Sequence, residues 1–205
     1  MQSFDAARRM GVIRRAVALG CAVALAAGSA YAQSKADPSR GAAKAAPCAG
    51  CHGSPDRVPL AGTPYLASQQ GEFLILQMFL MREGLRDVSQ MAGMLNGFSD
   101  RDLDDVAAYF ASQSPARAEA GGDPKLRARG AALAKGMACG SCHLDNYSGQ
   151  RQVPRIVNQR EDYLVAAMMA YRDNKRTGAD TSMNGILYQV PDSDIRALAH
   201  FLAHQ

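Results

Sequence analysis

The hydrophobic positions of this chain recur mainly with the period of an α-helix. The segment 99–110, "SDRDLDDVAAYF", shows the pattern plainly, with apolar residues on one helical face at Leu103, Val106, Ala107 and Phe110. Ser99 suits the N-cap and Asp102 occupies the third helical position, an arrangement close to a capping box. Aspartates also crowd the first turns, where the helix dipole favours anions. A helix is therefore expected near residues 100–112.

The same period appears in other parts of the chain. Apolar runs predict one helix near 71–83 and another near 161–173, and a closing pattern predicts a helix near 192–203. A short alanine-rich helix is expected before each of two cysteine pairs. Strand signals are weak throughout, so the predicted fold class is all-α.

The N-terminal residues follow a different pattern. Four arginines, among the first 15 residues, precede an apolar run of 12 residues at 16–27, which is too short to span a bilayer. Ala30-Tyr31-Ala32 then forms a small-x-small cleavage site. We therefore expect residues 1–32 to be a secretory signal peptide, cut before Gln33, and the mature protein to be periplasmic.

Two other signals fit the N-terminus less well. Arg8-Arg9 resembles a twin-arginine signal with poorly fitting flanks, and Cys21 is a candidate lipoprotein cysteine although few residues separate it from Arg15. No later segment has the uninterrupted apolar length of a transmembrane helix. The sequence thus predicts an exported, soluble chain.

Charge argues against one broad class of function. The full chain has 23 basic and 19 acidic side chains, and the predicted signal peptide holds four arginines and one aspartate. The mature chain therefore has 19 basic and 18 acidic side chains. This near balance lacks the basic footprint of a nucleic-acid-binding protein, so no nucleic-acid partner is expected.

The mature chain is an internal duplication. Three pairs of segments match at offsets of 90 to 92 residues: 48–52 with 139–143, 64–74 with 154–164, and 99–110 with 191–202. The small differences in offset are what loop insertions produce. Among the identical matched positions are Pro64 with Pro154 and Gln69 with Gln159.

The duplication predicts two tandem domains, at residues 33–114 and 125–205. The residues between them, 115–124, are rich in proline, glycine and alanine and are typical of a linker. Both domains are small for a hydrophobic core. Chains of this size commonly need a disulfide, metal or cofactor to be stable.

The motif Cys-x-x-Cys-His, a signature of haem c attachment, occurs once in each domain. Thiols at positions i and i+3 of a helical turn face the same way, so both can form thioether bonds to one porphyrin. The next residue is then held beneath the iron as an axial ligand. Two covalent haem c groups are expected, one on Cys48, Cys51 and His52 and one on Cys139, Cys142 and His143.

Three other uses of the cysteines fit less well. A shared zinc site is disfavoured because 87 residues separate the two pairs, against roughly 15–20 in zinc ribbons. A thioredoxin-like pair needs a βαβ context that the sequence lacks. Disulfides across two intervening residues would be strained. None of the three explains a histidine that follows both pairs.

The duplication also selects a second axial ligand. Met91 and Met183 match at the offset of 92 that aligns the following helices, whereas Met94 matches Ile186. A ligand should recur in both domains, so Met91 and Met183 are predicted to bind iron. Met94 is expected to be a packing residue behind Met91.

Other methionines and histidines have simpler interpretations. Five further methionines are expected to pack in the core: Met78, Met81, Met137, Met168 and Met169. A bis-histidine haem would need His200 or His204, but His200 matches Ala108 in the first domain. These two histidines are expected on a solvated helical face near the C-terminus.

These motifs together resemble cytochrome c4, a family of dihaem cytochromes c built from two class I cytochrome c domains. The resemblance extends over nearly all of the mature chain and includes both Cys-x-x-Cys-His motifs and the run "MAGMLNGFSDRDLDDVAAYFASQ" at 91–113. It implies two domains related by pseudo-twofold symmetry, each wrapped around one haem. It also implies that the first methionine of the Met-x-x-Met run is the ligand, in agreement with Met91.

The resemblance assigns roles to further residues. It implies that the carbonyls of Pro64 and Pro154 accept a hydrogen bond from the proximal histidines, a contact that fixes each ring. It also implies close packing of the first and last helices of each domain, at Gly41 with Tyr109 and at Gly130 with Phe201. The chain departs from the family at Leu144, where a glycine usually follows the second motif.

The function implied is one-electron transfer between respiratory donors and a terminal acceptor such as an oxidase, with no enzymatic reaction. Expected partners are redox proteins, namely a membrane cytochrome complex, a terminal oxidase or a dehydrogenase subunit, and peripheral membrane association is compatible with this role. One alternative is the dihaem subunit of an exported dehydrogenase complex, as in flavocytochrome c. A more remote alternative is a dihaem peroxidase or a thiosulfate-oxidising cytochrome, which needs an open or unusually ligated haem.

Overall fold

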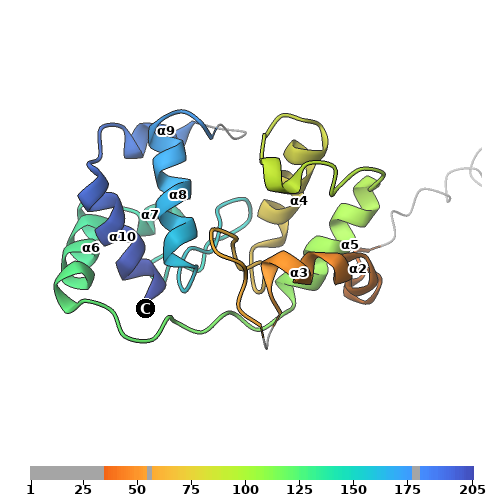
Figure 1. Cartoon of the computed structure of the whole chain (residues 1–205), viewed down its shortest axis with the longest axis horizontal. Helices are drawn as coiled ribbons and strands as arrows, with labels where there is room; N and C mark the ends of the chain where they lie inside the picture. The colour runs from red at the N-terminus through yellow and green to blue at the C-terminus, as the bar shows by residue number, and fades with distance from the viewer. Residues whose placement is uncertain (1–34, 55–56, 177–180) are drawn as a thin grey trace, which may run out of the picture. The chain divides into compact units, whose positions relative to one another are not determined.

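The computed structural model describes residues 35–54, 57–176 and 181–205. All of these residues except Lys35 lie in one compact unit, Ala36–Gln205. The predicted signal peptide and Cys21 lie outside the described residues. Nine α-helices are present in the described ranges (Figure 1): α2 (Pro38–Ala45), α3 (Ala49–His52), α4 (Gly71–Arg82), α5 (Asp100–Ala111), α6 (Pro124–Gly136), α7 (Gly140–His143), α8 (Glu161–Arg172), α9 (Ser182–Leu187) and α10 (Asp192–Ala203). No helix in these ranges is both long and apolar enough to cross a membrane.

The all-α prediction is confirmed. The four long helices expected from periodicity, α4, α5, α8 and α10, end within one residue of the predicted positions. β-Structure in the described segments is limited to two isolated bridges, Ser54 with Arg57 and Gln150 with Val153. Both bridges lie in the loops that follow the Cys-x-x-Cys-His motifs.

The hydrophobic core forms two clusters, one in each half of the duplication. The first gathers residues of α4 and α5, and the second gathers the matching residues of α8 and α10. The predicted stripe of α5 is buried throughout, and Met78 and Met168 occupy matching buried positions in the two clusters. Each half therefore buries its own small core.

Glycines allow the first and last helices of each half to cross at close range. A Cβ added to Gly41 of α2 would lie 2.0 Å from the Asp105 carbonyl oxygen of α5 and 2.9 Å from Tyr109 Cβ. A Cβ added to Gly130 of α6 would lie 2.1 Å from the Ala197 carbonyl oxygen of α10. Figure 1 shows α6 beside α10 and α2 beside α5. The helix contacts expected at both glycines are confirmed.

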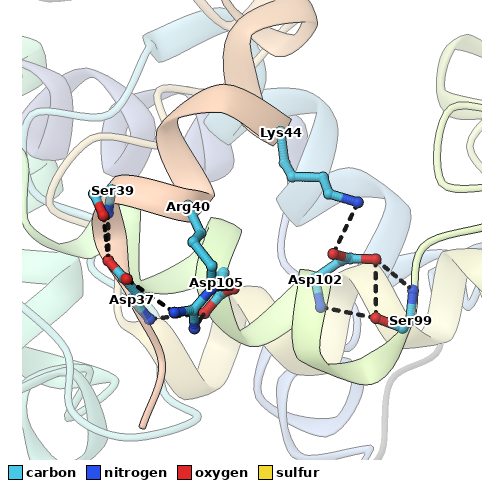
Figure 2. A network of polar contacts seen from close by, with 7 residues as sticks. All are labelled: Asp37, Ser39, Arg40, Lys44, Ser99, Asp102 and Asp105. Carbon is cyan, nitrogen blue, oxygen red and sulfur yellow. Dashed lines mark hydrogen bonds and ion pairs between the residues drawn. The ribbon is translucent and has the colours of Figure 1, made fainter. Parts of the chain in front are cut away.

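An ion-pair network adds to the crossing of α2 and α5 (Figure 2). Arg40 donates to both carboxylate oxygens of the buried Asp105, from Nε at 2.7 Å and from NH2 at 2.8 Å. The Asp37 amide donates to the same carboxylate at 2.7 Å, and the Asp37 side chain caps α2 by accepting from the Ser39 amide. The hydrogen bonds from Arg40 hold the pKa of Asp105 below its usual value, so this buried carboxylate stays ionised.

The capping box predicted at the start of α5 is present (Figure 2). Ser99 Oγ accepts from the Asp102 amide at 3.2 Å, and the Asp102 side chain accepts from the Ser99 amide at 2.9 Å. Lys44 of α2 lies 2.9 Å from the other oxygen of Asp102. Hydrogen bonds from Lys44 and then from Ser99 lower the pKa of Asp102 to about 2. The cap therefore also joins the first and last helices of this half.

The expectation that His200 and His204 occupy a solvated face is wrong, since their exposed fractions are 6% and 9%. The segment before α6 covers them: the Asp123 amide donates to His200 Nε2 at 2.8 Å, and Gly122 has no room for a side chain against either ring. The Glu119 amide also donates to the Ala203 carbonyl. The helical pattern could not reveal this cover because it comes from outside the helix.

The residue after each motif histidine has a backbone conformation that normally requires glycine. Gly53 has φ 75° and ψ −172°, and Leu144 has φ 68° and ψ 160°. This region is nearly exclusive to glycine and costs other residues about 1–3 kcal/mol. Leu144 therefore adopts nearly the backbone conformation of Gly53 without being a glycine.

Leu144→Gly is expected to raise the free energy of unfolding by about 1 kcal/mol, because relief of strain exceeds the lost packing and the added chain entropy. Gly53→Ala is the reciprocal change and is expected to lower it by about 2 kcal/mol or more, since its Cβ would meet the Arg57 carbonyl oxygen at 2.3 Å. Urea unfolding followed by far-ultraviolet circular dichroism measures both. A Leu144→Gly chain that is less stable than its parent would contradict the claim that the backbone at Leu144 is strained.

Candidate functional site

The four cysteines of the two motifs lie at matching places in the two halves. Cys48 ends a short 3-10 turn and Cys51 lies in α3, while Cys139 and Cys142 lie at the N-cap and within α7. All four are unpaired. The first cysteine of each motif is half-buried against the local core, and burial raises the pKa of both Cys48 and Cys139. Each motif therefore presents two thiols on one turn, the arrangement needed for two thioethers.

The motif histidines are held in one tautomer. His52 Nδ1 lies 3.0 Å from the Pro64 carbonyl oxygen, and His143 Nδ1 lies 2.8 Å from that of Pro154. Because a carbonyl oxygen only accepts, Nδ1 carries the proton in both rings and Nε2 is left with its lone pair. Burial lowers the pKa of both histidines, although the carbonyl contact opposes this. The rings are thus neutral and oriented as metal ligands.

The candidate methionines pack toward the two cores. Met91 contacts the same hydrophobic cluster as Cys48, and Met183 contacts the same cluster as Cys139. Met91 ends a 3-10 turn, Ser89–Met91, and Met183 lies in the first turn of α9. The structure therefore brings each predicted methionine and the first cysteine of its motif to one core.

The residues three positions later point away from the cores. The exposed fraction is 48% for Met94 and 44% for its counterpart Ile186. The expectation that Met94 packs behind Met91 is therefore wrong: the turn that directs Met91 inward directs Met94 to solvent. This difference supports the choice of Met91 over Met94 as a ligand.

A cluster of two arginines and a tyrosine was not predicted from the sequence. The Tyr163 hydroxyl accepts a hydrogen bond from Arg176 at 3.3 Å, and Arg86, whose charge also acts on Tyr163, donates to Gln77 Oε1 at 2.6 Å. Burial would raise the pKa of Tyr163, but the two guanidinium groups outweigh it and lower the pKa. Arg86 and Arg176 match at the offset of 90, a signal that the duplication already contained.

In the described part of the chain, no ion pair joins either of these partly buried arginines to a carboxylate, the partner that buried cations usually have. Burial, followed by the like charge of Arg176, lowers the pKa of Arg86. Arg176 Nε is buried without a hydrogen-bond partner in the described part of the chain. Haem carries acidic propionates that match such cations, vinyl groups that match the paired thiols, and an iron that matches neutral imidazole and thioether sulfur. The residues present therefore fit haem c.

Another cluster has the residue types of a metal site but a different role. Glu161, His200 and His204 place their potential ligand atoms within 4.8 Å of one another. Because His200 Nε2 accepts the Asp123 amide, its proton is on Nδ1, which donates to Glu161 at 3.0 Å. A metal on Nδ1 would leave Nε2 protonated and facing that amide. The cluster is therefore a hydrogen-bond network that holds the segment before α6.

Comparison with known proteins gives consistent similarities. The family described as cytochrome c matches residues 127–205. Cytochrome c4 of Pseudomonas aeruginosa is 36% identical over 182 residues, which is 83% of this chain and 90% of that protein. The crystal structure of reduced recombinant cytochrome c4 from Pseudomonas stutzeri superimposes with a TM-score of 0.74 at 32% identity, covering 82% of this chain and 98% of that one.

A relative with a more specific description is also similar. The thiosulfate dehydrogenase electron acceptor of Thiomonas intermedia is 29% identical over 178 residues, which is 79% of this chain and 80% of that protein. The similarity covers nearly as much of this chain as that to cytochrome c4 of Pseudomonas aeruginosa, but the sequence identity is lower.

Proposed function

The chain belongs to the cytochrome c4 family of dihaem cytochromes c, and we propose that it carries single electrons in the periplasm between respiratory donors and a terminal acceptor such as an oxidase. It is an electron-transfer protein with two covalently bound haem c groups. Haem c supplies reversible one-electron exchange at its iron. The donor, the acceptor and the compartment are parts of the proposal.

Each half has its own set of residues for one haem. We assign the thioethers to Cys48 and Cys51 in the first half and to Cys139 and Cys142 in the second. The axial pairs are His52 with Met91 and His143 with Met183. The observation that carries this assignment is that each half holds a neutral imidazole on a proline carbonyl and packs a methionine and the first motif cysteine against one core.

With His52 and Met91, and His143 and Met183, as the residues that would hold the two haem irons, no iron position would be left for substrate, which supports electron transfer in place of substrate chemistry. The Pro64 and Pro154 carbonyls hold the imidazole rings in orientation, so little rearrangement accompanies the change of charge. Methionine together with histidine raises the reduction potential of haem. Met91 and Met183 are partly buried and pack against the apolar clusters, a position that would limit the access of water to an iron held there. These features support a carrier with a high potential.

A second candidate function is the electron acceptor of a dehydrogenase. The similarity to the thiosulfate dehydrogenase electron acceptor of Thiomonas intermedia favours it. In this role the chain would still transfer single electrons, but its donor would be an exported dehydrogenase subunit. Co-purification of the native protein with such a subunit would support this candidate, and purification as a freely diffusing carrier would support the first.

Met91→Ala and Met183→Ala test the proposed ligands. Each variant is expected to lose about half of the methionine–iron charge-transfer absorption near the red end of the visible spectrum, because each removes one of two equivalent ligands. Each should also bind carbon monoxide in the reduced state at one haem. The matched control Met94→Ala should keep the full band and bind no carbon monoxide.

The parent protein provides the decisive comparison. Rapid carbon monoxide binding to the reduced parent, at either haem, would overturn the carrier proposal in favour of a haem with an open site. Loss of the band in Met94→Ala with retention in Met91→Ala would exchange the ligand assignment and leave the function intact.

A further inference from the structure

Two glutamines matched by the duplication bond to the opposite half of the molecule. Gln159 Oε1 accepts from the Tyr65 amide at 2.8 Å, and its Nε2 donates to the Tyr65 carbonyl at 3.0 Å. Gln69 makes the same pair of bonds to Arg155, at 2.7 Å and 2.9 Å. The contacts are reciprocal, as expected for two units related by a twofold axis. Both glutamines are buried.

The peptide groups that these glutamines contact are the ones next to the motif histidines. The Pro64 carbonyl accepts from His52 Nδ1 and shares one peptide group with the Tyr65 N–H that donates to Gln159. The Pro154 carbonyl accepts from His143 and shares its peptide group with the Arg155 N–H that donates to Gln69. A continuous hydrogen-bonded chain thus runs from each histidine to the glutamine of the other half.

We propose that each glutamine sets the reduction potential of the haem in the opposite half: Gln159 acts on the haem of His52 and Gln69 on the haem of His143. The inference rests on the histidine ligation proposed above. The glutamines are positioning residues, because they act through a peptide group and a histidine and do not touch the iron. The halves therefore influence each other's potentials by way of two buried side chains.

The direction of the effect follows from the resonance of the peptide group. An acceptor on the N–H increases the partial negative charge on the carbonyl oxygen of the same group. That oxygen then attracts the Nδ1 proton of the histidine more strongly, which makes the imidazole a more basic ligand. A more basic ligand favours ferric iron. Each glutamine is thus expected to lower the potential of the opposite haem.

The geometry of the amides makes this effect specific. Gln159 Oε1 also accepts from the Arg160 amide at 3.0 Å, and Gln69 Oε1 from the Gln70 amide at 2.9 Å. Since two N–H groups point at Oε1 and a carbonyl faces Nε2, the orientation of each amide is determined by its partners. Burial lowers the local dielectric, so the polarisation along the chain is stronger than it would be in water.

Gln159→Leu tests the proposal in the full dihaem protein. Reduction of each haem is followed by NMR through its own methyl signals during a redox titration. The ferrous-to-ferric ratio of the His52 haem at a fixed solution potential is expected to rise about threefold, equivalent to about 28 mV for one electron. The His143 haem should stay within about a quarter of that shift. Gln69→Leu should give the reverse pattern.

Gln70→Leu is the matched control. Gln70 also crosses to the other half, donating to the Ser148 and Gly149 carbonyls at 2.9 Å and 3.1 Å, but it does not bond to the peptide group of Pro154. Its loss should leave both potentials unchanged. Equal shifts in Gln70→Leu and Gln159→Leu would show that loosened packing between the halves causes the effect, and would overturn the proposal.

A second variant tests whether the leucine side chain itself, and not the loss of the acceptor oxygen, changes the potential. Gln159→Glu keeps an acceptor oxygen, so the potential of the His52 haem should not rise above that of the parent, in contrast to the rise expected for Gln159→Leu. The same sign in both variants, or unchanged potentials in all variants with normal haem spectra, would overturn the proposal and leave the carrier function standing. Loss of the methionine–iron band in the parent would instead contradict the proposed ligands.

Discussion

A chain carrying Cys48→Ser and Cys51→Ser is expected to lose one covalent haem and, with it, the cooperative folding of its first half. Among the described residues, the apolar cluster of this half contains eight buried members, so the haem is expected to supply much of what a small domain needs to fold. The expected loss is at least about 5 kcal/mol, the whole stability of a small domain. A haem-stained gel with a quantitative haem assay should give one haem per chain.

The second half provides an internal comparison for that experiment. Its cluster is built from its own helices, so its urea transition should persist in the Cys48→Ser and Cys51→Ser chain. The mirror variant, Cys139→Ser with Cys142→Ser, should spare the first half. Native-like cooperative unfolding of the haem-free half, followed by circular dichroism, would contradict the idea that haem is part of its core.

Gly130→Ala is expected to lower the free energy of unfolding by more than about 3 kcal/mol, within the range of severe overpacking. The added Cβ would lie 2.1 Å from the Ala197 carbonyl oxygen and 2.5 Å from Phe201 Cβ, so α6 and α10 must move apart. In a helix interior, alanine is more favourable than glycine by about 1 kcal/mol. The expected decrease in the free energy of unfolding already includes this gain. Urea unfolding measures the change.

The same helix offers a matched control for this prediction. Gly136 ends α6 and has no atom within 4 Å of an added Cβ, so Gly136→Ala should be neutral or slightly stabilising. Gly41→Ala is the counterpart in the first half and should behave like Gly130→Ala, because its Cβ would lie 2.0 Å from the Asp105 carbonyl oxygen. If Gly130→Ala and Gly136→Ala unfold at the same urea concentration, the close crossing is not required.

Local signals were sufficient for the helices and for pairing the two halves. The stripe of α5 and the cap at Ser99 act within one helix, so the sequence contains all of their determinants. The duplication is informative for a different reason: residues with the same role are expected at matching positions of the two homologous halves. It distinguishes Met91 from Met94 as the predicted ligand, and the 48% exposure of Met94 supports that prediction.

The sequence by itself determined the helical class, the two motifs, the matched methionines and the matched prolines, because each is encoded by neighbouring residues or repeated in both halves. Only the tertiary structure decided the rest. It covered His200 and His204 with a distant segment, gathered Arg86, Arg176 and Tyr163, and connected each glutamine to the other half's histidine. These contacts join residues far apart in the chain, and their partners depend on how the folded elements pack.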